Sequence, residues 1–341
     1  MRILELPEIR RALAVWRPNK AYAGAILRMR EALIAYSRGE CDTPMPMHLE
    51  IAPQNAEVHM KSSYRRGGRY FAVKMASTFP GNARRGLATG NGMMMLSSAE
   101  TGEPEVFLAD AGHLTDFRTA AVAAMAAREL GRADASIGIL GTGIQARLQA
   151  QLHAEVLDLK HVWIWGRNPA RVEECRRDLA VLLPRATIGV ADSPRSLAQE
   201  TNLIVTATAS RQPLLAARDL RPGTHVSAVG SDAPGKQELD PQILRNAALL
   251  LVDSRRQCEK LGELQHAPDQ WQRAVELGAF CESGPEQHEP QQREPQQHEP
   301  KPHDNDAAPS GWDRAGVTVC DFTGLGVEDL YIAEYCYQRA N

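Results

Sequence analysis

The most constraining feature of this sequence is a glycine-rich turn between an apolar run and a helical segment. Residues 137–146 read Ile-Gly-Ile-Leu-Gly-Thr-Gly-Ile-Gln-Ala, and good helix formers follow them to residue 152. The apolar residues suit a buried parallel strand, and Gly141 and Gly143 would let the backbone approach a phosphate at a helix N-terminus. A glycine pair alone is often only a tight turn. With this strand and helix around it, the turn predicts a dinucleotide-binding site.

Apolar runs that alternate with helical stretches continue beyond this turn. They span residues 162–165, 187–190, 203–207, 225–229 and 249–253. Such alternation predicts a parallel sheet with helices on both faces, in which ligands bind beyond the carboxyl ends of the strands. The second of these strands ends in Gly166-Arg167-Asn168, where NAD-binding proteins commonly carry a carboxylate for the ribose. Arg167 could instead pair with a 2′-phosphate, so the sequence favours NADP(H) over NAD(H), although a glycine there leaves room for either cofactor.

The part of the chain before residue 118 has a different pattern of apolar residues. Residues 7–36 carry apolar side chains at helical intervals and are interrupted around Pro18, which predicts two helices. Strand-like segments follow at 48–51, 57–61, 70–75, 93–96 and 105–109. In the segment 70–75, Lys74 lies on the face opposite Phe71 and Val73. This pattern alone favours a solvated lysine on the polar face of an antiparallel sheet.

Two further charged residues stand at the ends of predicted elements. Arg118 lies in the first turn of an alanine-rich helix that we expect to open at Thr115, where a cation opposes the helix dipole. A nearby anion would explain it, but an exposed arginine fits equally well. Asp232 follows the fifth strand, close to Pro234-Gly235, where a turn or helix-capping aspartate is the simplest interpretation. Lys236, in the same loop, is ambiguous.

Composition limits the possible functions. The chain has 341 residues, is 43% hydrophobic, and carries a formal net charge of -3, which favours small-molecule partners over nucleic acid. Its six cysteines are scattered, so neither a disulfide framework nor a zinc site is indicated. We find no signal peptide and no apolar run of about eighteen residues, and we expect a cytoplasmic protein without membrane contact.

A polar repeat interrupts the last third of the sequence. Residues 286–300 repeat Glu, Gln, His and Pro in a pattern that cannot bury a core, so we expect a disordered insertion at about 283–310. His288, His298 and His303 could bind a metal ion weakly, but a solvated insertion is favoured and no metal site is expected.

Several motifs together resemble the ornithine cyclodeaminase/mu-crystallin family in order and spacing, over nearly the whole chain. They are Val73-Lys74-Met75, Pro80-Gly81-Asn82, Leu114-Thr115-Asp116-Phe117-Arg118-Thr119-Ala120-Ala121, Gly141-Thr142-Gly143 and Gly230-Ser231-Asp232-Ala233-Pro234-Gly235-Lys236. The resemblance implies an α/β fold in which a Rossmann-type parallel-sheet domain, residues 119–313, is inserted into an α+β domain. That second domain, residues 1–118 with 314–341, would bind substrate and form a homodimer.

The resemblance also implies roles for individual residues. Lys74 and Arg118 would hold the carboxylate of a small amino or imino acid, and Asp232 would serve its nitrogen as general acid or base. Glu57 has a family-like place in the substrate domain, although a surface glutamate is about as plausible. Contacts to NAD(P)H are implied for Thr89, Gly141, Thr142, Gly143, Ile144, Gln145, Arg167, Thr206 and Lys236.

Three functions are compatible with this resemblance. The first is an NAD(P)H-dependent imino acid reductase that also runs as an amino acid dehydrogenase. The second is a cyclodeaminase that releases ammonia and uses NAD⁺ catalytically, and the third is a mu-crystallin-like protein that binds NADPH and a small ligand. Family cyclodeaminases carry an additional arginine on an early strand, and here only His48 or Lys61 could stand in its place. An ornithine substrate is therefore not implied.

Overall fold

The computed structural model describes residues 1–14, 21–283 and 312–340. The insertion expected at about 283–310 and the break expected around Pro18 lie outside the described residues. The chain divides into two compact units, one formed by Met1–Val122 with Gly324–Asn341 and the other by Ala123–Thr323. The second unit contains a parallel sheet and interrupts the sequence of the first, so the predicted insertion of a parallel-sheet domain into a mixed domain is confirmed.

The first unit is built on a seven-stranded, mostly antiparallel sheet. Its strands run in the order β1-β7-β6-β5-β4-β2, with β3 also paired to β4. The strands are β1 (Arg2–Glu5), β2 (Cys41–Asp42), β3 (Met47–Ile51), β4 (Ala56–Arg65), β5 (Tyr70–Thr78), β6 (Gly90–Ser98) and β7 (Pro104–Ala109). Only β1 and β7 pair in parallel. The other neighbours in this sheet pair antiparallel, as the alternating sequence pattern predicted.

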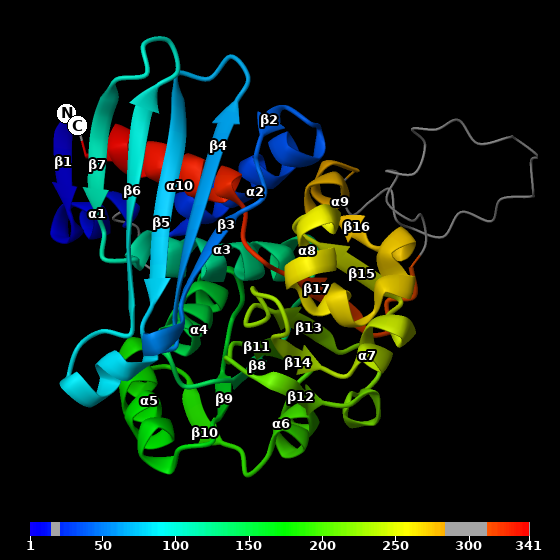
Figure 1. The fold of residues 1–341 in the computed structure, drawn as a ribbon. Helices are drawn as coiled ribbons and strands as arrows, with labels where there is room; N and C mark the ends of the chain where they lie inside the picture. The colour runs from blue at the N-terminus through cyan, green and yellow to red at the C-terminus, as the bar shows by residue number, and fades with distance from the viewer. Residues whose placement is uncertain (15–20, 284–311, 341) are drawn as a thin grey trace, which may run out of the picture. The chain divides into compact units, whose positions relative to one another are not determined.

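Helices cover this sheet and complete its core. They are α1 (Leu6–Leu13), α2 (Ala23–Ser37) and α10 (Gly326–Arg339), and α10 packs against α2, β4 and β5. The ribbon shows α10, in red, along the blue and cyan strands (Figure 1). Most side chains of α10 are buried, including Val327, Leu330 and Ile332. The C-terminal helix is therefore a core element of the N-terminal sheet.

Lys74 shows which face of β5 is buried. Ala72 and Lys74 point into the unit, and Lys74 is 2% exposed, whereas Val73 on the opposite face is 37% exposed. The interpretation of Lys74 as a solvated lysine is therefore wrong. The alternation was read correctly, but the face with the small and charged residues is the one covered by α10.

The second unit contains an eight-stranded sheet in the order β10-β9-β8-β11-β13-β17-β15-β16, with parallel pairing throughout. Its strands are β8 (Ser136–Leu140), β9 (His161–Trp165), β10 (Thr187–Val190), β11 (Leu203–Thr206), β13 (His225–Ala228), β15 (Leu249–Val252), β16 (Val275–Glu276) and β17 (Thr318–Asp321). The helices of this unit are α4 (Ile144–Val156), α5 (Pro169–Leu182), α6 (Pro194–Glu200), α7 (Pro241–Asn246), α8 (Arg255–Leu261) and α9 (Leu277–Ser283). A separate pair joins β12 (Arg211–Leu215) and β14 (Gln237–Leu239).

The strand nearest the C-terminus lies inside this second sheet. β17 pairs with β13 on one side and with β15 on the other, and all four of its residues are buried. The sequence analysis placed the second domain boundary between residues 313 and 314, which would have assigned β17 to the first domain. In the structure the chain passes back to the first unit after Thr323.

Helix α3 (His113–Glu129) begins earlier than expected. The buried carboxylate of Asp110 accepts a hydrogen bond of 2.7 Å from the backbone N–H of Leu114, which satisfies a donor in the first helical turn. The helix therefore starts at His113 rather than Thr115. Arg118 consequently lies in the second turn and not in the first.

Among the residues that the structure describes, no helix combines the length and the apolar character needed to cross a bilayer.

Candidate functional site

The glycine turn after β8 has the shape that the sequence predicted. The turn leads directly into α4, and the backbone N–H of Gly141 donates to the carbonyl of Trp165 at the end of β9. Gly141 has a φ of 132°, and a Cβ there would lie 2.5 Å from the carbonyl oxygen of Ala207. A Cβ on Gly143 would meet no heavy atom within 4 Å. Gly141 therefore allows close packing of the turn, while Gly143 leaves open space in front of the N-terminus of α4.

A cavity of about 260 Å³ opens beside this turn, at the carboxyl ends of β8, β9 and β11. Its lining residues are Gly141, Thr142, Gly143, Trp165, Gly166, Arg167, Asn168, Arg171, Ala207, Thr208, Ser210 and Leu214. This edge is where ligands bind in parallel α/β sheets, and the open N-terminus of α4 suits a phosphate. The chain therefore has a fitting place for a dinucleotide.

Not every residue expected at the cofactor lines this cavity. Gly141, Thr142, Gly143 and Arg167 do, whereas Thr206 is fully buried at the end of β11, one residue before the lining begins. Ile144 and Gln145 stand in the first turn of α4. Thr89 belongs to the first unit, where its carbonyl accepts from the backbone N–H of Phe79.

A buried carboxylate that the sequence analysis did not single out holds two loops beside the cavity. Glu238, in β14, accepts hydrogen bonds from the backbone N–H groups of Thr208 and Gly230, at 2.6 and 3.0 Å. Burial raises the pKa of Glu238 to about 7, against the effect of these hydrogen bonds and those from threonine hydroxyls. Glu238 thus joins the loop after β11 to the loop after β13, which carries Asp232.

Asp232 lies in that second loop and not at a helix N-terminus. Its Oδ1 is 2.7 Å from Nζ of Lys236, and its side chain is 46% exposed. The helix-capping interpretation of Asp232 is therefore wrong, because the loop continues into β14 rather than into a helix. A partly exposed carboxylate with a lysine partner can exchange protons with solvent or with a ligand.

Lys74 and Arg118 meet inside the first unit, in a cluster of buried charges. Arg118 donates to Glu328 Oε2 through Nη1 at 2.8 Å and to Asp329 Oδ1 through Nε at 3.1 Å. Nζ of Lys74 lies 3.5 Å from Asp329 Oδ2. The four side chains are each 5% exposed or less. The anion that the sequence analysis sought for Arg118 is therefore supplied by the chain itself.

The cluster shifts the proton affinities of its members. Burial lowers the pKa of Lys74, although the charge of Asp329 opposes the change. For Asp329, burial favours the neutral acid, but the positive charges of Lys74, Arg118 and Lys61 outweigh it and its pKa is lowered. Lys61 also approaches α10, donating through Nζ to the carbonyl of Gly324 at 2.7 Å. Lys61, Lys74 and Arg118 all therefore lie close enough to Asp329 to act on its charge.

Glu328 and Asp329 are the functional candidates that the sequence analysis missed. They stand in the first turn of α10, just after a glycine-containing segment. Two adjacent acidic residues at that position read as ordinary helix-dipole partners. Their burial at 1% exposure is the feature that distinguishes them, and it depends on the packing of α10 on the sheet.

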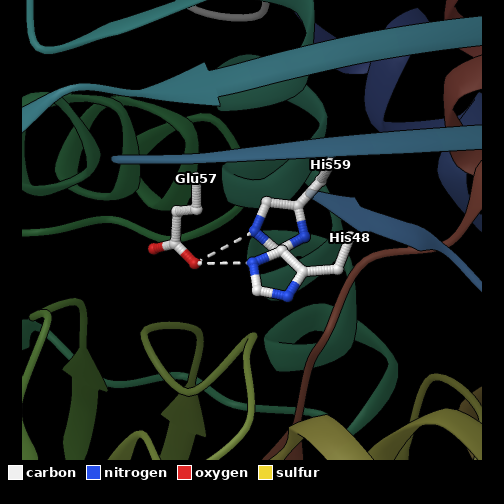
Figure 2. A group of neighbouring side chains, drawn as sticks. All are labelled: His48, Glu57 and His59. Atoms are coloured by element: carbon white, nitrogen blue, oxygen red, sulfur yellow. Dashed lines mark hydrogen bonds and ion pairs between the residues drawn. The ribbon is translucent and has the colours of Figure 1, made fainter. Parts of the chain in front are cut away.

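Glu57, expected to contact substrate, lies beside two histidines. His48 and His59 direct their Nε2 atoms at the same oxygen of Glu57 (Figure 2). The three side chains come from β3 and β4, within the first unit. Asp232 belongs to the second unit, so its approach to Lys74, Arg118 and Glu57 stays a prediction.

Known proteins resemble this chain over most of its length. A sequence model of the ornithine cyclodeaminase/mu-crystallin family matches residues 13–291. The chain is 36% identical over 301 residues to an uncharacterized cyclodeaminase of Sinorhizobium fredii, which covers 87% of this chain and 84% of the relative. It is 29% identical over 317 residues to alanine dehydrogenase of Archaeoglobus fulgidus, covering 93% of this chain and 90% of the relative.

A solved structure shares the fold. Delta(1)-pyrroline-2-carboxylate reductase of Thermococcus litoralis, in complex with NADH and L-proline, matches with a TM-score of 0.83. The match covers 100% of this chain and 97% of that chain, at 22% sequence identity.

The two glycines of the turn should respond differently to a methyl group. Gly141→Ala places a Cβ against the carbonyl of Ala207 at an unfavourable φ, so we expect a loss of stability of about 1–3 kcal/mol. Gly143→Ala meets no atom of the chain, so its unfolding temperature should match the wild type while NAD(P)H affinity falls by about tenfold or more. Thermal unfolding and a fluorescence titration with NADH and NADPH measure both effects. A Gly143→Ala protein with wild-type affinity would contradict a phosphate site at this turn.

Proposed function

Because this chain belongs to the ornithine cyclodeaminase/mu-crystallin family, we propose that it is an NAD(P)H-dependent imino acid reductase that also runs as an amino acid dehydrogenase. Its substrate would be a small amino or imino acid. The relatives named as an alanine dehydrogenase and a pyrroline-2-carboxylate reductase support this reaction class.

The observation that carries the proposal is the pair of buried cationic side chains Lys74 and Arg118, which both contact Asp329. Cationic groups held in a poorly solvating site attract a carboxylate, and a small amino or imino acid carries one. Lys74 and Arg118 would then fix the α-carboxylate, as a hydride transfer at the neighbouring carbon requires.

Asp232 has the chemistry for the second requirement, a proton carrier for the substrate nitrogen. Reduction of an imine adds a proton to nitrogen, and oxidation of an amine removes one. The carboxylate of Asp232 is partly exposed, so it can receive a proton and release it, and the Lys236 ammonium at 2.7 Å favours the ionised form that accepts one. A bound nicotinamide supplies or accepts the hydride.

The cofactor preference is also part of the proposal. Arg167 lines the cavity next to the glycine turn, and Asn168 uses its side chain to cap α5 by accepting from the backbone N–H groups of Ala170 and Arg171. No carboxylate of the cavity lining is available for ribose hydroxyls. Arg167 favours a 2′-phosphate, and we therefore propose that NADP(H) is preferred over NAD(H).

A cyclodeaminase is the second candidate function. It is favoured by the Sinorhizobium fredii relative, whose name assigns it to that class. The same residues could serve a reaction that removes ammonia from a diamino acid and returns the hydride to the product. The two candidates differ in whether the cofactor is consumed.

We also propose a cytoplasmic location and a dimeric assembly for this protein. The six cysteines are free thiols, which suits the reducing cytoplasm. We propose a homodimer formed by the first unit, whose edge strands β1 and β3 expose Ile3, Met47 and Leu49.

A substrate panel tests the proposed reaction. The purified chain is incubated with NADH or NADPH and a set of cyclic and linear α-imino acids, and in reverse with amino acids and NAD⁺ or NADP⁺. We expect stoichiometric oxidation of NAD(P)H by at least one imino acid, followed at the nicotinamide absorbance. Ammonia release from a diamino acid with catalytic NAD⁺ would assign the chain to the cyclodeaminases instead. No turnover of either kind across the panel would contradict an enzymatic role.

The role of Asp232 can be tested with an isosteric change. Asp232→Asn keeps an oxygen that can accept from Lys236 but cannot carry the proton, so we expect kcat to fall by about 10²–10⁴-fold with little change in NAD(P)H affinity. Asp158→Asn, at a surface ion pair with Lys160 in the same unit, is the matched control and should leave kcat unchanged. Wild-type kcat in Asp232→Asn would remove this residue from the mechanism.

Charge reversal at Arg167 tests the cofactor preference. An aspartate would repel the 2′-phosphate and accept from ribose hydroxyls, so Arg167→Asp should lower the affinity for NADPH by about tenfold or more and preserve that for NADH. Arg177→Asp makes the same charge change on an exposed position of α5 outside the cavity lining. The dissociation constants of both cofactors are compared by titration. If Arg167→Asp bound NADPH as tightly as the control, the phosphate contact would be ruled out.

A further inference from the structure

The register of β3 and β4 gathers three metal-ligating side chains on one face of the first unit's sheet. The two strands pair antiparallel, with His48 directly opposite His59 and Glu50 opposite Glu57. Opposite residues share a face of the sheet, and so do residues two apart in one strand. His48, His59 and Glu57 therefore project to the same side, although His48 and Glu57 are nine positions apart in the sequence.

The side-chain geometry brings their donor atoms to one point. Nε2 of His48 lies 3.5 Å, and Nε2 of His59 3.3 Å, from the same Oε2 of Glu57. The three donor atoms lie within 4.8 Å of one another. The imidazole rings stack with centroids 4.8 Å apart and an angle of 17° between their planes, so both nitrogens face the carboxylate from the same side (Figure 2).

The two nitrogen–oxygen separations fit the edges of a metal coordination polyhedron. In a tetrahedral site with metal–ligand bonds of about 2.1 Å, neighbouring donor atoms stand about 3.4 Å apart. The two measured nitrogen–oxygen separations, 3.3 and 3.5 Å, bracket that value. In the metal-free chain His59 and Glu57 share a hydrogen bond that is longer than the optimal length of about 2.9 Å, and His48 lies farther still from the same oxygen. Two nitrogens converging on one carboxylate oxygen are thus spaced for a shared cation.

We propose that His48, Glu57 and His59 form a binding site for a divalent first-row transition-metal ion, with Zn²⁺ as the best match. Two imidazole nitrogens and one carboxylate oxygen are the donor set that Zn²⁺ accepts, and three protein ligands leave a coordination position for water or another ligand. The partial exposure of all three side chains gives an ion access from solvent.

The site lies beside the cluster of buried cations. Every second residue of β4 projects to the same face, which places Lys61 on the face of Glu57 and His59. Lys61 pairs with Lys74 of β5. Two residues of a strand span about 7 Å, so the bound ion would lie one such step from the Lys61–Lys74 pair. The site does not use Lys74 or Arg118 but includes Glu57, the residue expected to contact substrate, and metal binding can be measured without the proposed reaction.

Metal binding to the full-length chain tests the assignment. The protein is stripped with a chelator, dialysed and titrated with Co²⁺, whose visible absorption reports tetrahedral coordination, and the bound Co²⁺ is then displaced by Zn²⁺. We expect one ion per chain and a higher unfolding temperature with Zn²⁺ than without it. The absence of a visible Co²⁺ spectrum, or of tight Zn²⁺ binding by calorimetry, would overturn the proposal.

Variants locate the ion. His59→Phe keeps a ring to stack on His48 but removes a donor atom, and it should weaken Zn²⁺ binding by on the order of 100-fold. Glu57→Gln is the second variant and should weaken binding in the same direction. Unfolding of each metal-free variant at the wild-type temperature shows that the effect is not loss of folding.

Two controls exclude other donors on this chain. Replacement of His288, His298 and His303 by glutamine should leave the site intact, because these histidines belong to the insertion expected at about 283–310 and not to β3 or β4. Intense near-ultraviolet charge transfer in the Co²⁺ form would indicate cysteine thiolates as ligands. Three results would contradict a site at His48, Glu57 and His59. They are loss of binding in the triple variant, a thiolate signal in the Co²⁺ form, and wild-type Zn²⁺ affinity in His59→Phe.

Discussion

The first unit depends on a small group of charges that are buried together. Arg118 from α3 and Lys74 from β5 are held by Glu328 and Asp329, which enter from the first turn of α10. Removing one partner from a buried ion pair strands the other charge in a poorly solvating environment, at a cost of about 3–5 kcal/mol. The cluster therefore fastens the C-terminal helix to the N-terminal sheet, and it also holds two cations in fixed positions.

This arrangement explains how one part of the chain could serve both stability and the proposed binding of a substrate carboxylate. The guanidinium of Arg118 is oriented by two carboxylates through different nitrogens, so little side-chain freedom would be lost when an anion arrives. Lys61, through its bond to the carbonyl of Gly324, adds a further positive charge next to α10. A preorganised cation site of this kind favours a carboxylate over a neutral ligand of similar size.

Much of the fold was readable from local patterns. Alternating hydrophobicity located β4 and β5, and the apolar run followed by Gly141 and Gly143 predicted the β8–α4 turn, because each pattern reflects a short-range steric or burial requirement. Because these patterns are short-range, they did not predict that Lys74 is buried. Alternation shows that two faces exist, but the identity of the covered face depends on α10, more than 250 positions later in the sequence.

The site residues that escaped the sequence analysis share this dependence on distant packing. Glu328 and Asp329 became recognisable only with their burial, and Glu238 only with its hydrogen bonds to Thr208 and Gly230. The triad of His48, Glu57 and His59 required the antiparallel register of β3 and β4, which the strand patterns alone did not set. The family resemblance, by contrast, directed attention to Lys74, Arg118 and Asp232 through motifs that remain local in sequence.

The position of β17 has a consequence for how the protein is made. A nascent chain leaves the ribosome from its N-terminus, and β13 and β15 are separated in the finished sheet by a strand that is translated much later. Until residues 318–321 emerge, that sheet has a gap at its centre, and the N-terminal sheet still lacks its covering helix α10. Both units can therefore complete their cores only after β17 and α10 have been synthesised.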